Sequence, residues 1–224
     1  MRLAPERSSH RIVAMAKTIY DLKPAFQNLL RPLTTGVWRM GITANQVTAG
    51  AAVLSLAAGG VLLYCAGNPR ALLVLPPVLF VRMALNAIDG MLAKEFGMKS
   101  RLGAILNELG DVISDTALYL PLALGWGFSP ALVVLIVVLA VMSEMAGVLG
   151  LMVGAGRRYD GPMGKSDRAF VFGAMGLAIG FGAPPGRWQN VVLAAVLLLL
   201  AVTVVNRARM ALREGNPLGE GRPQ

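Results

Sequence analysis

Residues 85–115 read LNAIDGMLAKEFGMKSRLGAILNELGDVISD, and this stretch decides how the rest of the chain is interpreted. It consists of two largely apolar segments joined by a short basic loop. Polar side chains recur three or four positions apart in each segment, so each set shares one face of a helix. Two such faces turned toward each other form a cup lined with oxygen atoms. We call it the polar cup, and its members are Asn86, Asp89, Asn107, Asp111 and Asp115.

Carboxylates within apolar segments favour a functional site. An Asp at the centre of a membrane-spanning helix costs roughly 2.5 to 3.5 kcal/mol, and less near the helix end. Several such residues in one stretch are therefore expected only where they are solvated, paired or used in chemistry. The alternative is a set of interfacial residues whose polar ends reach the headgroup region.

The composition favours an integral membrane protein with one domain. Of the 224 residues, 55% are hydrophobic and only 15% are charged, which is too apolar for a soluble domain of this length. The net charge of +9 comes from basic residues between apolar runs, so we expect an anionic lipid surface and no nucleic acid as partner. The single Cys65 excludes an internal disulfide, and the single His10 makes a zinc site unexpected.

Six apolar runs predict an all-α integral membrane protein with six transmembrane helices. Each run is close to the about 20 residues that a bilayer core requires, and they cover residues 46–66, 71–91, 103–124, 129–153, 168–184 and 188–206. Short connectors predict a compact bundle. The expected organisation is a cytoplasmic N-terminal arm (1–40), a membrane domain (41–210) and a flexible cytoplasmic tail (211–224).

The N-terminal arm has no apolar run near Met1, so we expect no signal peptide there. Between Ile19 and Met40, apolar residues recur at helical spacing among Lys23, Arg31 and Arg39. This pattern favours an amphipathic juxtamembrane helix on the membrane surface, and a helix packed on the protein explains it equally well.

Basic residues fall mostly on one side of the six predicted spans. That side receives the N-terminal arm, the loop with Lys94, Lys99 and Arg101, the loop after the fourth span, and the tail. The opposite loops carry only Arg70 and Arg187. The positive-inside rule then predicts that both termini are cytoplasmic, and the polar cup faces the cytoplasm.

The donor atoms of the polar cup suit a hard divalent cation. Mg2+ is usually bound by one or two protein carboxylates together with substrate phosphates. Asp89 and Asp111 supply two carboxylates beside two asparagine amide oxygens. Gly90 and Gly103 lack Cβ atoms, which lets a ligand or a second helix approach. The residues alone therefore predict metal-assisted phosphoryl or phosphodiester chemistry.

The same stretch resembles the signature of the CDP-alcohol phosphatidyltransferases, D-x2-D-G-x2-A-R-x8-G-x3-D-x3-D. Every spacing is kept; the chain matches at Asp89, Gly90, Ala93, Gly103 and Asp111, and departs at Asn86, Lys94 and Asn107. Residues 43–48, TANQVT, resemble the stretch that opens the first span in this family, and residues 164–169, GKSDRA, resemble the segment before the fifth. The chain is most similar to a bacterial subgroup with asparagines in the acidic signature.

The resemblance implies an enzyme of phospholipid synthesis in the bacterial cytoplasmic (inner) membrane. The family transfers a phosphatidyl group from CDP-diacylglycerol to an alcohol acceptor and releases CMP, using divalent cations such as Mg2+ or Mn2+. Carried over by position, the metal ligands are Asn86, Asp89, Asn107 and Asp111. The resemblance also assigns Asp111 as general base, and the CDP contacts to Gly90, Ala93, Lys94 and Gly103. It further implies a homodimer.

The departures from the signature affect the expected activity. Two carboxylates in place of four remove two negative charges, so we expect weaker metal binding, with one ion instead of two; Asp115, one turn beyond Asp111, compensates in part. Lys94 keeps the charge of arginine without its bidentate fork. We therefore expect an altered enzyme. The alternatives are a catalytically inactive relative that binds lipid or a partner, and, ranked third, a small membrane transporter.

Several further polar residues have two interpretations. Arg82 binds a phosphate or pairs with a buried carboxylate, and Asp115 and Lys165 meet a phosphate or the acceptor. Glu144, within the fourth predicted span, contacts the acceptor or pairs with Arg82. Glu108 is expected to pair with a basic residue of the preceding loop, Lys99 or Arg101.

Three arginines near the fifth predicted span, Arg157, Arg158 and Arg168, are explained by positive-inside charge alone. The alternative is that they bind a phosphorylated acceptor.

Overall fold

The computed structural model describes the backbone of residues 9–215 and the side chains of residues 24–215. Within that range it contains helices and no strand, which confirms the all-α prediction. The elements in chain order are α1 (Ser9–Arg39), α2 (Ala44–Tyr64), η1 (Pro69–Val74), α3 (Leu75–Glu95), α4 (Arg101–Tyr119), η2 (Leu120–Leu124), α5 (Pro130–Leu149), η3 (Gly150–Val153), α6 (Lys165–Gly180) and α7 (Arg187–Glu214).

Helices lie at all six positions predicted for spans, but only four are long and apolar enough to cross a membrane. These four cover Ala44–Tyr64, Pro69–Glu95, Pro130–Val153 and Arg187–Glu214. The helix α4 carries four charged residues, Arg101, Glu108, Asp111 and Asp115, and α6 has only 16 residues. The coarser prediction of a helical membrane protein is confirmed, whereas six full spans stay a prediction.

The turn between α3 and α4 positions the residues of the polar cup. Gly97 follows the end of α3 with a φ of +70°, a left-handed conformation that glycine adopts without steric cost. The backbone N–H of Met98 donates back to the carbonyl of Leu92 over 3.3 Å. Ser100 then caps α4, because its side chain accepts a hydrogen bond from the N–H of Gly103. The chain therefore reverses direction within five residues, 96–100.

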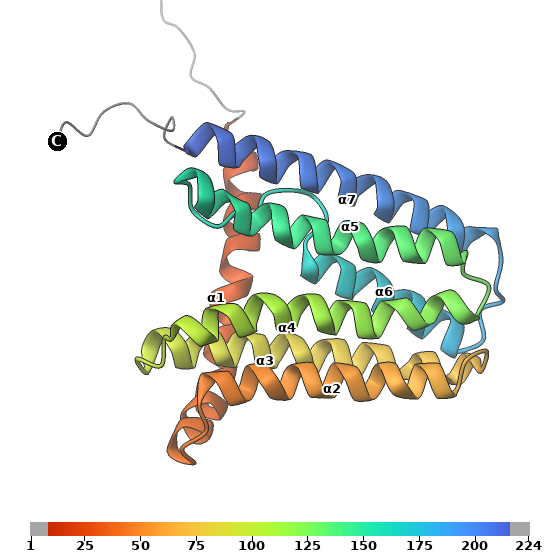
Figure 1. The fold of residues 1–224 in the computed structure, drawn as a ribbon, viewed down its shortest axis with the longest axis horizontal. Coiled ribbons are helices and arrows are strands. Elements are labelled where there is room, and N and C mark those ends of the chain that lie inside the picture. Colours follow the sequence, from red (N-terminus) through yellow and green to blue (C-terminus); the bar gives the residue numbers. More distant parts are fainter. Residues whose placement is uncertain (1–8, 216–224) are drawn as a thin grey trace, which may run out of the picture.

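The helices α2 to α7 lie side by side, and α1 crosses one end of them at a steep angle (Figure 1). At that same end lie the α3–α4 loop, the α5–α6 loop and the end of α7. The basic loops that the sequence assigns to one side therefore share one end of the bundle.

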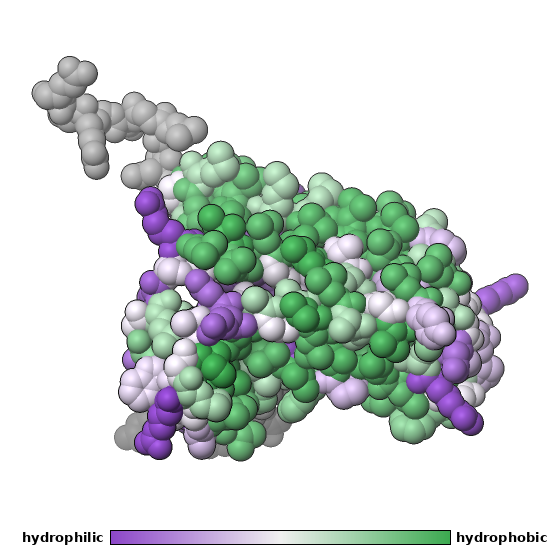
Figure 2. All heavy atoms as spheres, turned by 60° about the horizontal axis from the view of Figure 1, so that its bottom comes forward, coloured by the Kyte–Doolittle hydropathy of each residue, from purple (hydrophilic) through white to green (hydrophobic). Residues whose placement is uncertain are grey.

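The middle of the bundle is covered by apolar side chains, and hydrophilic side chains gather toward its ends (Figure 2). Exposed members of the apolar region include Val53, Phe80, Val191 and Leu198, each with more than half of its surface accessible. An exposed apolar surface of this extent marks contact with lipid or a partner, and its placement between two polar ends fits a bilayer.

The helix α1 is longer than the predicted amphipathic helix, since it begins at Ser9. Its described side chains hold it against α3: Arg31 pairs with Glu95 over 2.5 Å, and the ring of Phe26 meets that of Phe80 edge-on at 6.3 Å. The interpretation as a helix packed on the protein therefore holds for residues 24–39, and its crossing angle also suits a position along the membrane surface.

Close approach between helices depends on small residues. A Cβ atom on Gly59 of α2 would lie 2.2 Å from the backbone oxygen of Ala117 in α4, so only glycine permits this crossing. Two residues further along α4, the ring of Tyr119 stacks on the ring of Phe172 in α6, with centroids 4.2 Å apart. These contacts hold α4, which carries half of the polar cup, in a fixed position against α2 and α6.

Candidate active site

The polar cup begins with a direct contact between α3 and α4. The side-chain amide of Asn86 donates to Oδ1 of Asp111 over 3.0 Å, so two residues 25 positions apart meet as the signature spacing requires. Asp89, only 6% exposed, accepts a 2.7 Å hydrogen bond from the hydroxyl of Thr48 in α2. Sequence reasoning missed Thr48, although it lies in the TANQVT stretch.

Asp111 accepts hydrogen bonds from three side chains. Its Oδ1 accepts from Asn86 and from Nη2 of Arg82, the latter over 3.1 Å. Its Oδ2 accepts from Nζ of Lys165, over 2.7 Å. An ionised carboxylate has about four lone-pair positions, so one acceptor position remains on Oδ2.

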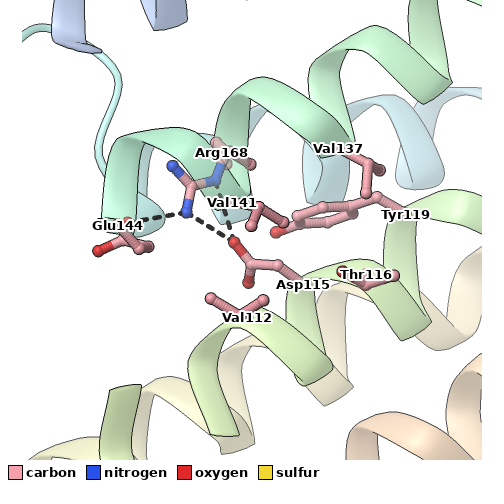
Figure 3. Close-up of a pocket in the computed structure, with 9 residues that line it drawn as sticks. Val112, Asp115, Thr116, Tyr119, Val137, Val141, Glu144 and Arg168 are labelled. Atoms are coloured by element: carbon pink, nitrogen blue, oxygen red, sulfur yellow. Dashed lines mark hydrogen bonds and ion pairs between the residues drawn. The ribbon is translucent and has the colours of Figure 1, made fainter. Parts of the chain in front are cut away.

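Asp115 lies one helical turn after Asp111, and the guanidinium groups of Arg82 and Arg168 both bind it. Arg82 forms an ion pair with Oδ1, and Arg168 donates to Oδ2 from Nε over 3.0 Å and from Nη2 over 2.7 Å. The second N–H of Nη2 reaches Glu144 in α5, 3.2 Å away. Figure 3 shows Asp115 from α4, Glu144 from α5 and Arg168 converging on a narrow crevice, with the ring of Tyr119 along one wall.

Glu144 is surrounded by arginines from three segments. Besides Arg168, it pairs with Arg157 over 3.1 Å and with Arg207 of α7 over 3.2 Å. Arg207 is 2% exposed and also donates to the carbonyl of Ser143. The sequence suggested for Arg207 only a place among the basic residues of the cytoplasmic side; its position on the inward face of α7 distinguishes it.

The remaining basic residues of the α5–α6 loop are also paired. Arg157 pairs with Glu108 of α4, to which its Nη2 donates over 2.6 Å, and Arg158 binds Asp160 at 2.8 Å and also Glu214. The hydrogen bond from Arg158 holds the pKa of Asp160 below its ordinary value, so this carboxylate is ionised at neutral pH. Arg158 is thereby neutralised.

We call this system the charge network; six of its members are buried, and Arg157 and Glu108 are partly exposed. Four guanidinium groups face four carboxylates; its members are Arg82, Arg157, Arg168, Arg207, Glu108, Asp111, Asp115 and Glu144. Buried charges are tolerated when they are paired and hydrogen-bonded. The network therefore links α3, α4, α5, α6 and α7. It shares Asp111 and Asp115 with the polar cup.

The other residues of the predicted site line the path toward the loop. Asn107 and Ala93 are half-buried, and Lys94 is exposed. A Cβ atom on Gly90 would meet nothing within 4 Å, so open space lies beside it. Gly103 differs, because a Cβ there would lie 2.6 Å from Oδ1 of Asn45. Gly103 thus makes room for α2, and the open space suited to a ligand is at Gly90.

Two expected pairings are wrong. Glu144 does not pair with Arg82, because Arg82 lies between Asp111 and Asp115. Glu108 pairs with Arg157 instead of the loop residues Lys99 and Arg101. Arg157, 49 positions from Glu108, is brought to it by the packing of the α5–α6 loop against α4. For Arg82, the structure selects the carboxylate partner.

The donor set of the polar cup fits a single hard cation better than two. Asp89 and Asp111 offer carboxylates, and Asn86 and Asn107 offer amide oxygens, which are ligands suited to Mg2+ or Mn2+. Among the described residues, no group of three or more Asp, Glu, His or Cys side chains is arranged to hold a metal. Oδ2 of Asp111 also carries Lys165, so that ammonium group and a cation compete for the same oxygen.

The comparisons with known proteins agree with this geometry. The family model for CDP-alcohol phosphatidyltransferases matches residues 41–206. The chain belongs to this family. The CDP-alcohol phosphatidyltransferase resemblance read from the signature is therefore confirmed over most of the membrane domain.

Relatives in sequence include proteins with and without a stated reaction. The inner membrane protein YnbA of Escherichia coli is 46% identical over 195 residues, which are 87% of this chain and 96% of that protein. The phosphatidylinositol phosphate synthase of Mycobacterium marinum is 35% identical over 107 residues, 47% of this chain and 43% of that protein.

Solved structures share the fold of this CDP-alcohol phosphatidyltransferase. The Mycobacterium tuberculosis phosphatidylinositol phosphate synthase with CDP-DAG bound superimposes with a TM-score of 0.70 at 21% identity, covering 86% of this chain and 98% of that one. The same enzyme in complex with manganese and citrate gives a TM-score of 0.70 over 85% and 92% of the two chains. At this identity the likeness establishes the architecture alone.

Proposed function

We propose that this protein transfers a phosphatidyl group from CDP-diacylglycerol to an alcohol, releasing CMP, at the cytoplasmic face of a bacterial inner membrane. The observation that carries the proposal is the contact of Asn86 with Asp111 beside the buried Asp89. It sets oxygen donors near one end of an apolar bundle, where a lipid donor and a water-soluble acceptor can both arrive. Phospholipid synthesis is the corresponding process.

In the proposed mechanism, Asp111 acts as the general base. It takes the proton of the acceptor hydroxyl at the free position of Oδ2, and the hydroxyl oxygen attacks the phosphorus that carries the diacylglycerol. The diphosphate P–O bond then breaks, and CMP leaves with the electron pair. Arg82 and Asn86 keep the Asp111 carboxylate oriented throughout. The open space at Gly90, with Ala93 and Lys94 nearby, receives the CDP moiety.

The polar cup holds one divalent cation in this proposal, through Asn86, Asp89, Asn107 and Asp111. Bound there, Mg2+ or Mn2+ supplies Lewis-acid neutralisation of the diphosphate charge. Lys165 is 39% exposed at its side chain, so it can leave Asp111 and follow a phosphate oxygen of the donor. Its departure frees the second position of Oδ2 for the cation, while the acceptor proton takes the position that is already free.

The shared basic end of the bundle supports the proposed orientation with both termini in the cytoplasm. A homodimer remains a prediction from the family resemblance, to be checked by the mass of the purified protein in detergent.

The direct test is CMP release by the purified protein in nanodiscs. We expect release from CDP-diacylglycerol with Mg2+ or Mn2+ and a suitable member of an alcohol panel that includes inositol, glycerol phosphate and serine. Loss of release on chelation, with recovery on adding back the cation, is part of the expected result. Absence of CMP with every acceptor would favour the inactive, lipid-binding alternative.

Restoring a carboxylate at position 107 should strengthen metal binding. Asn107→Asp adds a negative charge at the polar cup, and we expect the Mn2+ dissociation constant to fall about tenfold, which is about 1.4 kcal/mol. The measurement is Mn2+ titration by electron paramagnetic resonance. Asn86→Asp should act likewise, but with a lower melting temperature without metal, because it replaces the N–H donor facing Asp111.

Asn28→Asp is the matched control, since Asn28 is exposed on α1. If Asn107→Asp binds Mn2+ no more tightly than this control, then position 107 is not part of the metal site.

A further inference from the structure

Three guanidinium groups converge on one buried carboxylate beside the proposed site. Glu144 is 5% exposed, and Arg157, Arg168 and Arg207 lie 3.1, 3.2 and 3.2 Å from its oxygen atoms. Three such donors around a single anion form the kind of arrangement with which proteins bind a phosphate group. Here the chain itself supplies the anion.

This arginine cluster adjoins the place where the acceptor must lie. Lys165 and Arg168 lie three residues apart at the start of α6. Lys165 contacts Asp111, and Arg168 contacts Glu144. Arg82 pairs with both Asp111 and Asp115. An acceptor whose hydroxyl meets Oδ2 of Asp111 therefore extends toward the segment that carries Arg157 and Arg168.

The arginines of that segment are already neutralised. Arg157 is shared by Glu108 and Glu144, and Arg168 by Asp115 and Glu144. The charge network has four positive and four negative groups before any substrate binds. Lys165 adds one ammonium group at Asp111, but a phosphate on the acceptor would still add up to two negative charges beside arginines that are already paired, and most of its desolvation would go uncompensated.

We propose that Glu144 occupies the position that an acceptor phosphate would take, and that the acceptor is consequently an alcohol without a phosphate group. Glu144 is then a specificity-determining residue. A neutral hydroxyl-bearing acceptor needs only hydrogen bonds and leaves the network intact. The inference rests on the proposed phosphatidyl transfer and names the class of its acceptor.

Two arginines outside this cluster allow anion binding to be compared at a second place on the protein. Arg209 and Arg213 of α7 line a surface cavity of about 330 Å3 together with Asp160, Asn206 and Met210. Both arginines are exposed. Anion binding there is independent of Glu144, so it responds equally in the wild type and in a Glu144 variant.

The experiment compares matched acceptor pairs: glycerol with glycerol 3-phosphate, and inositol with inositol 1-phosphate. For the wild type we expect kcat/KM, measured by CMP release, to be at least about tenfold higher for the unphosphorylated member of the preferred pair. Glu144→Gln should shift this ratio toward the phosphorylated member by about tenfold or more, since it removes the internal anion. Glu95→Gln, the same change at the exposed pair with Arg31, should leave the ratio unchanged.

Binding of inorganic phosphate gives a readout that does not depend on turnover. Isothermal titration at millimolar phosphate should show a site in Glu144→Gln that the wild type lacks and that Arg168→Gln removes again. A wild type that prefers phosphorylated acceptors, or that binds phosphate at Arg168, overturns the inference while leaving phosphatidyl transfer standing. Absence of CMP release with every acceptor overturns the function instead, and the phosphate titration then judges the role of Glu144 alone. If Glu144→Gln does not fold, the wild-type acceptor ratio and wild-type phosphate titration decide.

Discussion

Replacing Asp111 with asparagine should lower CMP release about a thousandfold, within the 100- to 10,000-fold range of general-base contributions. The carboxylate is placed to receive the acceptor proton, because its Oδ1 is occupied by Arg82 and Asn86 while Oδ2 holds only Lys165. An amide in the same position has no basic oxygen of comparable strength. The measurement is the single-turnover rate of CMP formation at saturating CDP-diacylglycerol.

The Asp111→Asn variant should remain folded. Its amide oxygen can still accept from Arg82 and Asn86, so the contact between α3 and α4 persists. Asp167→Asn is the matched control: Asp167 lies in the first turn of α6 and accepts from the N–H of Gly164, which asparagine also does. We expect near wild-type turnover for the control, whereas full turnover in Asp111→Asn would refute its role as the base.

The parts of this fold that follow from local sequence were predictable. Apolar runs gave the positions of α2 to α7, since a bilayer core sets their length and composition. Helical spacing put Asn86 and Asp89 on one face and Asp111 and Asp115 on another. Because a tight turn at Gly97 joins the two helices, those faces had to meet near the loop.

The pairing of charges was not predictable in the same way. Arg157 and Glu108 are 49 positions apart, and Arg82 and Asp115 are 33 apart. Which basic residue meets which acid depends on helix rotation and depth, and the sequence periodicity of one helix constrains neither. Thr48 illustrates the limit: the TANQVT stretch marks it by resemblance, but nothing in the periodicity of its helix shows that its hydroxyl faces Asp89 from 41 positions away.

The number of membrane spans is difficult to predict for a different reason. The carboxylates that we propose for the active site also make α4 too polar to be recognised as a span by composition. Asp111 and Asp115 are nevertheless 5% exposed each, and their charge is met inside the bundle. Hydropathy counts those residues as if they faced lipid, whereas the structure pairs them with Arg82 and Arg168.

Removing Arg168 should destabilise the protein by about 3 to 5 kcal/mol, the range measured when one partner of a buried ion pair is lost. Arg168 is 1% exposed and joins α6 to α4 and α5 through Asp115 and Glu144. With methionine there, the chain fills similar space but leaves four carboxylates facing three guanidinium groups. We would measure the free energy of unfolding in mixed micelles, by denaturant titration followed by tryptophan fluorescence.

Two further variants separate lost charge from lost packing at Arg168. Arg209→Met makes the same change at an exposed position of α7, where we expect an effect within about 0.5 kcal/mol. Adding Asp115→Asn to Arg168→Met removes the excess negative charge, so the double variant should be more stable than Arg168→Met alone. An Arg168→Met protein as stable as the Arg209→Met control would mean that the charge network does not hold the bundle together, and that Asp115 and Glu144 are stabilised without this guanidinium.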